Sequence, residues 1–212
     1  YDGTTTQIAN YWLYTFIGTA PNPYPNDYPD WQGLGAGPGS IGTGGLENGT
    51  LATGYGFTMK GNTSGAQKYD FRGRANNGSI TTTLNSERET LVGNPYPSAI
   101  NATQFIQDNL SVITQIDFWV DGGSNSHNLS DYLGGYAVYN LTGGAPPSVP
   151  SGTNGTGSAA GTIPKQYIAV GQGFFIDALA GGTINFKNSQ RAFVIEAADT
   201  SKFLKTTKKV EA

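Results

Sequence analysis

The side chains that carry acid–base chemistry are few, and His127 is the only histidine in the chain. It lies in the polar stretch Asn125-Ser126-His127-Asn128, which follows a predicted strand. A Ser-His-Asp triad would need this histidine beside a strained nucleophile elbow, and the Gly-x-Ser-x-Gly pattern of such an elbow does not occur. The chain has no cysteine, so it offers neither a thiolate nucleophile nor a thiolate metal site. We therefore expect no catalytic residue and interpret His127 as a loop residue that is a candidate ligand contact.

Paired carboxylates are the other source of chemistry, because glycoside hydrolysis uses two of them on either side of a cleft. The aspartates at predicted strand ends and turns stand where this residue commonly bonds the local backbone, and no setting marks a general acid. These aspartates are Asp27, Asp30, Asp121, Asp131 and Asp177. A glycosidase-type module is therefore the less favoured alternative. Asp121 and Asn125 could supply oxygen ligands to calcium, but no Glu closes that loop, and we expect no metal or other cofactor.

Aromatic side chains give the better lead to function. Flat apolar rings beside Asn and Asp side chains suit a sugar-binding surface, because they combine stacking with directional hydrogen bonds. The structural alternative is that each ring seals a loop onto the fold. The candidate ligand contacts form two groups, one in a long loop before residue 50 and one near the histidine: Tyr24, Tyr28 and Trp31, then Trp119, His127 and Tyr132, with Tyr136 close by.

The composition indicates the class of fold that must position these rings. Charged residues make up 13% of the 212 residues, about half of the usual share, and the 31 glycines are about twice the usual share. Few charges, abundant Gly, Ser, Thr and Asn, and 12% aromatics are typical of an extracellular all-β protein with many turns. The net charge of −3 provides no field for nucleic acid or an anionic membrane, so we expect neither partner.

Alternating and β-branched runs predict a series of short strands. They cover residues 11–17, 56–60, 67–72, 79–84, 90–93, 113–120, 135–140, 166–172, 174–177, 183–187 and 191–196. After Ile100, the residues Asn101 to Gln104 have the form of a capping box, which predicts one short helix that ends before Asn109. Residues 20–50 and the low-complexity segment 143–161 are predicted to be loops, the second of them mobile.

A rigid motif, Asn94-Pro95-Tyr96-Pro97, stands near the middle of the chain, and Asn22-Pro23-Tyr24-Pro25 is an earlier copy of it. Because the prolines fix φ, we expect Tyr96 to be displayed on a stiff arm. Gly54-Tyr55-Gly56-Phe57 likewise matches Gly171-Gln172-Gly173-Phe174, and each is followed by a Phe and an Arg. We interpret the chain as two diverged copies of one β unit; similar strand-turn-strand segments without common descent are the alternative.

The predicted fold is an all-β antiparallel sandwich with one short helix after Ile100. Residues 1–88 would form the first β unit with its long Pro/Gly loop, residues 89–201 the second unit with an insertion, and residues 202–212 a linker-like tail. We expect four phenylalanines to be buried between the two sheets and to contribute on the order of 6–12 kcal/mol before entropy: Phe57, Phe71, Phe174 and Phe186. The chain starts at Tyr1 without Met, so we expect it to be a module of something longer.

Five longer stretches carry a resemblance to a known kind of protein: Gly54–Gly61, Leu91–Ile100, Gly134–Asn140, Val170–Phe175 and Phe186–Arg191. They resemble a module of the very large surface proteins that the type IX secretion system of Bacteroidota exports. The similarity runs from about Trp12 to Phe203. It implies an extracellular or cell-surface setting and a non-catalytic role in adhesion or assembly, and it carries over no catalytic residues.

The residues and the resemblance together predict a non-catalytic module of a secreted or cell-surface adhesin-like protein. Such a module would contribute adhesion, polysaccharide contact or spacing, and its partners would be polysaccharide or neighbouring surface-protein domains. A self-assembling structural subunit of a surface filament or sheath is the alternative, in which the long loop and the lysine-rich tail contact neighbouring copies.

Overall fold

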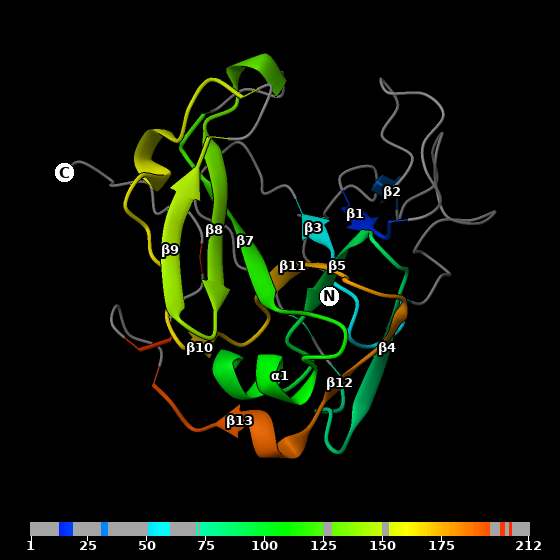
Figure 1. Cartoon of the computed structure of the whole chain (residues 1–212). Coiled ribbons are helices and arrows are strands. Elements are labelled where there is room, and N and C mark those ends of the chain that lie inside the picture. Colours follow the sequence, from blue (N-terminus) through cyan, green and yellow to red (C-terminus); the bar gives the residue numbers. More distant parts are fainter. Residues whose placement is uncertain are drawn as a thin grey trace, which may run out of the picture.

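A five-stranded antiparallel sheet forms the centre of the molecule (Figure 1). The computed structural model describes residues 13–18, 31–33, 51–59, 71, 73–124, 129–149, 153–195, 200, 201 and 204. The strand order of the sheet is β5-β11-β7-β8-β9. These strands are β5 (Glu89–Gly93), β7 (Gln115–Asp121), β8 (Gly134–Asn140), β9 (Gly143–Ser148) and β11 (Gly173–Asp177).

Three smaller antiparallel sheets surround the central one. The first has the order β2-β1-β3, with β1 at Leu13–Phe16, β2 at Trp31–Gly33 and β3 at Thr58–Met59. The second has the order β10-β6-β13, with β6 at Ala99–Asn101, β10 at Tyr167–Ile168 and β13 at Arg191–Ala192. The third pairs β4 (Ile80–Leu84) with β12 (Gly182–Phe186). These sheets confirm the predicted all-β, sandwich-like fold.

One α-helix, α1 (Ala102–Asp108), follows β6, and short 3-10 helices cover Leu129–Asp131, Gly157–Ala159 and Asn188–Gln190. As predicted, the Asn101 side chain accepts the first cap bond, from the Gln104 backbone N–H at 3.2 Å. The Gln104 amide does not return to complete a capping box, because it donates along the helix to Asp108 at 2.8 Å. No helix in the part of the chain that the structure describes is long and apolar enough to cross a membrane.

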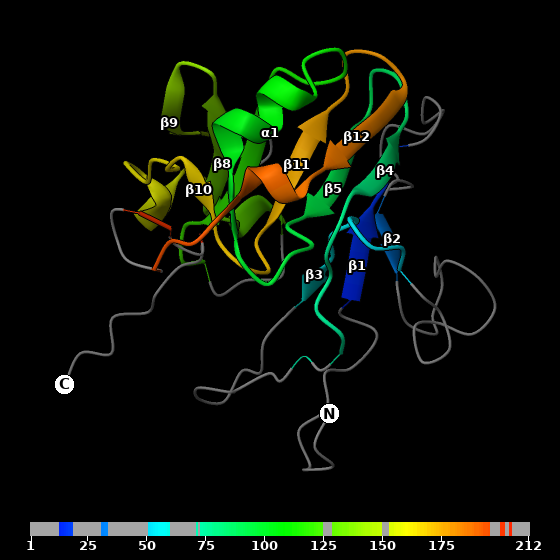
Figure 2. The same ribbon diagram turned by 90° about the horizontal axis from the view of Figure 1, so that it is seen from below.

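The main core lies between one face of the central sheet and the layer made by α1, β4 and β12. In Figure 2, α1 lies across the sheet beside β12. Phe105 of α1 stacks on Phe186 of β12, with ring centroids 4.9 Å apart, and meets Phe174 of β11 edge-on at 5.8 Å. Alternation along β7 adds two inward side chains to this core, Ile116 and Phe118, while Val120 packs in a second, smaller cluster with Ala137 and Ala159.

The prediction that four phenylalanines are buried together is half wrong. Phe174 and Phe186 are core residues, but Phe57 is 41% and Phe71 74% exposed. Gly56 explains the difference, since its backbone N–H donates to the Leu91 carbonyl and a Cβ on it would come within 2.6 Å of the Val92 carbonyl oxygen. The motif therefore approaches β5 through its glycine, and its phenylalanine stays outside.

The two Gly-x-Gly-Phe motifs meet at β5. On one side, Gly173 pairs with Gly93, and on the other Tyr55 forms a bridge to Val92. The first Asn-Pro-Tyr-Pro copy lies outside the described residues, so descent from one duplicated unit stays a prediction. The described elements of the two predicted units share hydrogen bonds, because β4 pairs with β12 along its whole length.

The segment predicted to be a mobile loop at residues 143–161 contains β9, so that part of the prediction is wrong. Strand β9 pairs with β8 through backbone groups, which need no particular side chain. Strand β9 tolerates Pro146 and Pro147 because it is the edge strand of its sheet. Proline has no backbone N–H, and an edge strand has a side on which no N–H is needed for pairing. The long loop before residue 50 likewise contains β2, which pairs with β1.

Tyr96 is buried, with 2% of its surface exposed, and the expectation that it is displayed is wrong. Its hydroxyl donates to the Gly78 carbonyl at 2.6 Å, and the Arg191 guanidinium lies over its ring at 5.2 Å from the centroid. Asn94 positions the turn, since its side-chain amide donates to the Ser98 and Ala169 carbonyls at 2.8 and 3.1 Å. The rigid motif therefore serves the core.

Candidate functional site

The candidate site lies on the face of the central sheet that points away from α1. Because successive side chains of a strand alternate, β7 sends Asp117 and Trp119 to this outer face. Strand β8 adds Tyr136, which pairs directly with Trp119, and β11 adds Phe175, which pairs with Asp117. Local alternation and strand register thus gather rings and a carboxylate on one surface.

Five rings form a continuous series on this face, which we call the aromatic row: Phe16, Trp31, Phe175, Tyr136 and Trp119. Trp31 of β2 meets Phe16 of β1 at 5.0 Å between centroids, and the two rings meet Phe175 at 6.1 and 5.6 Å. Phe175 meets Tyr136 at 5.5 Å, and Tyr136 meets Trp119 at 5.1 Å. All contacts are edge-to-face, the geometry that aromatic quadrupoles favour.

The row is packed tightly at Phe175 and more open at its two ends. Phe175 is 4% exposed, whereas Trp31, Tyr136 and Trp119 are half-buried. Trp119 rests against Gly134, where a Cβ would lie 2.7 Å from its ring and where φ is +150°. A side chain at that position would displace the indole, so the glycine fixes where the tryptophan lies.

Three carboxylates accompany the row, and we call them the acidic cluster: Glu89, Asp117 and Asp177. Glu89 and Asp177 are direct cross-strand partners on β5 and β11, which places their Cβ atoms about 5 Å apart. Burial raises the pKa of the Glu89 carboxyl, and the charges of Asp177 and Asp117 raise it further. Much of the Glu89 side chain is exposed to solvent, so we interpret this increase as modest.

Asp117 lies at the middle of the face. Burial raises the pKa of its carboxyl, Asp177 adds to the increase, and hydrogen bonds from Gln115 oppose it. The Gln115 amide donates to both carboxylate oxygens of Asp117, at 3.1 and 3.2 Å. The same carboxylates affect Tyr136: burial, together with the charges of Glu89 and Asp117, raises the pKa of its phenol to about 12. The phenol is therefore a neutral hydrogen-bonding group at physiological pH.

Rings beside carboxylate and phenol oxygens can stack on a sugar face and accept or donate hydrogen bonds to its hydroxyls. Hydrolysis would need a general acid in an apolar pocket, and both Glu89 and Asp177 are exposed. Among the described residues, no group of three or more His, Cys, Asp or Glu side chains could hold a metal ion. The rings and oxygens of this face therefore offer stacking and hydrogen-bonding contacts to a ligand.

The structure unites two of the ligand contacts named from the sequence. Trp31 and Trp119, 88 positions apart in the numbering, belong to the same aromatic row. Tyr132 is half-buried, and its backbone carbonyl accepts a bond from the Asn154 N–H at 2.8 Å. The Asp121 carboxylate accepts from the Gly123 N–H at 3.2 Å in a local turn. The remaining candidates lie outside the described residues: Tyr24, Tyr28, Asn125 and His127.

Sequence reasoning missed Glu89, Asp117, Phe16 and Phe175 as members of the site. The alternation of β7 could have shown that Asp117 shares a face with Trp119. No local signal places Phe175 opposite Asp117 or Glu89 opposite Asp177, because these pairs depend on which distant strands become neighbours.

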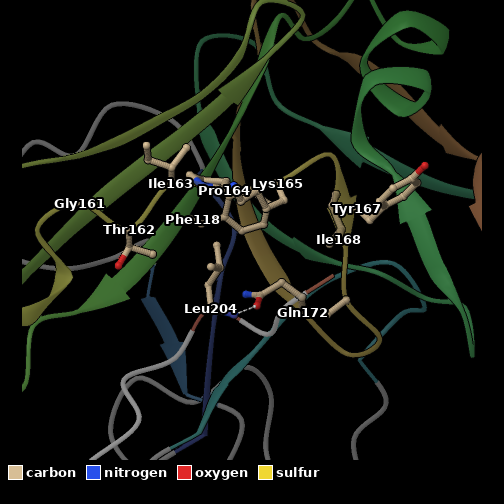
Figure 3. A pocket seen from close by; sticks show the side chains of 11 residues that line it. Phe118, Gly161, Thr162, Ile163, Pro164, Lys165, Tyr167, Ile168, Gln172 and Leu204 are labelled. Atoms are coloured by element: carbon tan, nitrogen blue, oxygen red, sulfur yellow. Dashed lines mark hydrogen bonds between the residues drawn. The ribbon is translucent and has the colours of Figure 1, made fainter. Parts of the chain in front are cut away.

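A separate hollow of about 350 Å³ lies beside the segment 161–165 and β10 (Figure 3). Phe118 lines it, and the Leu204 side chain points toward that ring. The Leu204 backbone N–H donates to the Gln172 side-chain oxygen at 2.7 Å, and its side chain packs against the main core. None of the candidate ligand contacts named from the sequence lines this hollow.

Comparison with known proteins gives a family but no related structure. No curated protein and no solved structure matches the chain. The family described as "Domain of unknown function (DUF8693)" matches residues 5–212, nearly the whole sequence. The chain therefore belongs to that family.

Proposed function

We propose that this chain is a non-catalytic module of a large secreted or cell-surface adhesin-like protein, and that it contacts polysaccharide through the aromatic row. The observation that carries the proposal is the convergence of Trp31, Tyr136 and Trp119 with polar oxygens on one sheet face. The extracellular setting is supported by the low charge content, the many turn residues and the resemblance to exported surface proteins. Export by a type IX system in a member of the Bacteroidota is part of this proposal.

Retention on insoluble polysaccharides tests the contact directly. Cellulose, chitin and amylose gels are the probes, and affinity electrophoresis gives a dissociation constant for each. Trp119→Ala should weaken binding about tenfold, because one lost stacking contact is worth about 1.4 kcal/mol. Trp119→Phe should keep part of the affinity, since it retains a ring at that position.

Phe193→Ala is the matched control, because Phe193 is fully exposed and follows β13 of a different sheet. It removes an aromatic ring without touching the row and should bind like the unaltered protein. Thermal unfolding of each variant shows that the fold is retained. Binding that is absent for all three polysaccharides, or unaffected by Trp119→Ala and Trp31→Ala, would remove polysaccharide contact from the proposal.

Self-assembly into a surface filament or sheath is the second candidate, and one observation favours it. Phe193 is 100% and Ile195 78% exposed, directly after β13 at the edge of its sheet. Apolar side chains along a strand edge suit pairing with another chain. Sedimentation at increasing concentration should then show association that Phe193→Asp abolishes, whereas a strict monomer at high concentration contradicts this candidate.

A further inference from the structure

The charged side chains of the acidic cluster, which lie beside the aromatic row, are all negative. Glu89, Asp117 and Asp177 stand on three adjacent strands of the same face, and the cross-strand pairing brings Glu89 directly opposite Asp177. Within the described residues, one ion pair is formed, between Lys187 and Asp108. Asp108 belongs to α1 and therefore lies on the other side of the sheet. No cation among the described residues therefore forms an ion pair with the carboxylates beside the row.

The electrostatics of the neighbouring groups agree with this arrangement. The carboxyl pKa values of Glu89 and Asp117 are raised partly by other members of the acidic cluster, which is the sign of like charges that repel one another. The phenol of Tyr136, inside the aromatic row, responds to Glu89 and Asp117 as well. A ligand group that approaches the Tyr136 and Trp119 end of the row therefore meets the field of at least two carboxylates.

We infer that the aromatic row accepts uncharged polysaccharides and rejects those that carry carboxylate groups, with the acidic cluster as the specificity determinant. This inference rests on the proposed function and adds the class of ligand. Stacking on Trp119 and Tyr136 favours any pyranose ring, so the rings alone do not discriminate by charge. A uronate stacked there would place its own carboxylate beside Asp117, where like charges repel in a partly desolvated setting.

The test compares each polysaccharide with its own charged derivative. Cellulose, chitin and amylose are used untreated and after oxidation of their primary alcohols to carboxylates, which leaves the backbone linkage unchanged. Whichever untreated polysaccharide binds, its oxidised form should bind about tenfold more weakly at low ionic strength. Salt should narrow this ratio, because screening weakens the repulsion.

Two variants with the same change in charge separate the acidic cluster from the overall charge of the protein. Glu89→Gln removes one carboxylate from the cluster and should narrow the untreated-to-oxidised ratio to about threefold. Asp108→Asn removes one carboxylate from the α1 side and should leave the ratio at about tenfold. Unfolding curves of both variants confirm that each is folded under the binding conditions.

The outcomes distinguish this inference from the proposed function. Equal binding of untreated and oxidised forms, or a ratio that Glu89→Gln and Asp108→Asn change alike, would overturn the inference and leave polysaccharide contact standing. If no untreated polysaccharide binds, both the proposed contact and the selectivity built on it are overturned.

Discussion

Asn94 offers the sharpest test of how this fold is held together. Asn94 is buried, with 7% of its surface exposed. The amide donates to the Ser98 and Ala169 carbonyls at 2.8 and 3.1 Å, and its oxygen accepts from the Tyr96 backbone N–H at 3.0 Å. A fourth contact, to the Ile168 carbonyl, is longer at 3.4 Å and therefore weaker.

Asn94→Ala removes these three bonds and leaves their partners without the side chain that satisfied them. At about 1 kcal/mol of net stabilisation for each bond, the free energy of unfolding should fall by about 3 kcal/mol. For a chain of this length the midpoint of thermal unfolding should fall by about 6–12 °C. Urea unfolding followed by circular dichroism measures the free energy, and scanning calorimetry measures the midpoint.

Asn76→Ala is the control, because the Asn76 amide makes one exposed bond, to the Pro95 carbonyl at 2.8 Å, beside the same turn. It should cost less than about 0.5 kcal/mol. Asn94→Asp preserves the shape but replaces two donors with a buried carboxylate that faces carbonyls, so its cost at neutral pH should be at least as large as that of Asn94→Ala. If Asn94→Ala unfolds like Asn76→Ala, the reasoning that the rigid motif serves the core is refuted.

Three further predictions concern the core and the site. Phe186→Ala should lower the free energy of unfolding by about 3–5 kcal/mol, because it removes the buried ring that stacks on Phe105 of the helix and leaves a cavity. In the same urea titration, Phe193→Ala should change the free energy of unfolding by less than about 0.5 kcal/mol. The raised phenol pKa of Tyr136, about 12, means that the neutral form is favoured in the fold, so stability should fall as pH rises from about 10 to 12. Burial also raises the phenol pKa values of Tyr55 and Tyr96, so Tyr136→Phe should lower the late-ionising ultraviolet absorbance by the amplitude of one phenol, and an unchanged late amplitude would contradict the assignment. Burial raises the carboxyl pKa of Glu89 in the folded protein, so the fold favours the protonated carboxyl over the carboxylate. The contribution of this group to stability is therefore fully present below the pKa of the unfolded chain and is lost as pH rises through the pKa of the folded protein. Glu89→Gln should therefore stabilise the protein by a few tenths of a kcal/mol at neutral pH and by nothing at about pH 3, and destabilisation at neutral pH would refute this reading.

Much of the local structure could be predicted because it depends on neighbouring residues. The alternation of Gln115 to Asp121 is a property of those seven side chains, and it correctly predicts a half-buried strand. The start of α1 follows from Asn101, whose side chain reaches the Gln104 N–H within one turn. Strand β9 was missed because its Gly- and Pro-rich residues carry no strand signal, and its pairing is supplied by β8.

The sequence by itself determined an all-β chain with one short helix, and it named aromatic residues, Trp31 and Trp119 among them, as candidate ligand contacts. Only the tertiary structure decided that Trp31 and Trp119 belong to one aromatic row and that Glu89 and Asp117 lie beside it. It also decided that Tyr96 is buried and Phe57 exposed. The physical reason is that alternation and capping act over a few residues, whereas strand order depends on how the whole chain buries its apolar surface and satisfies its backbone hydrogen bonds.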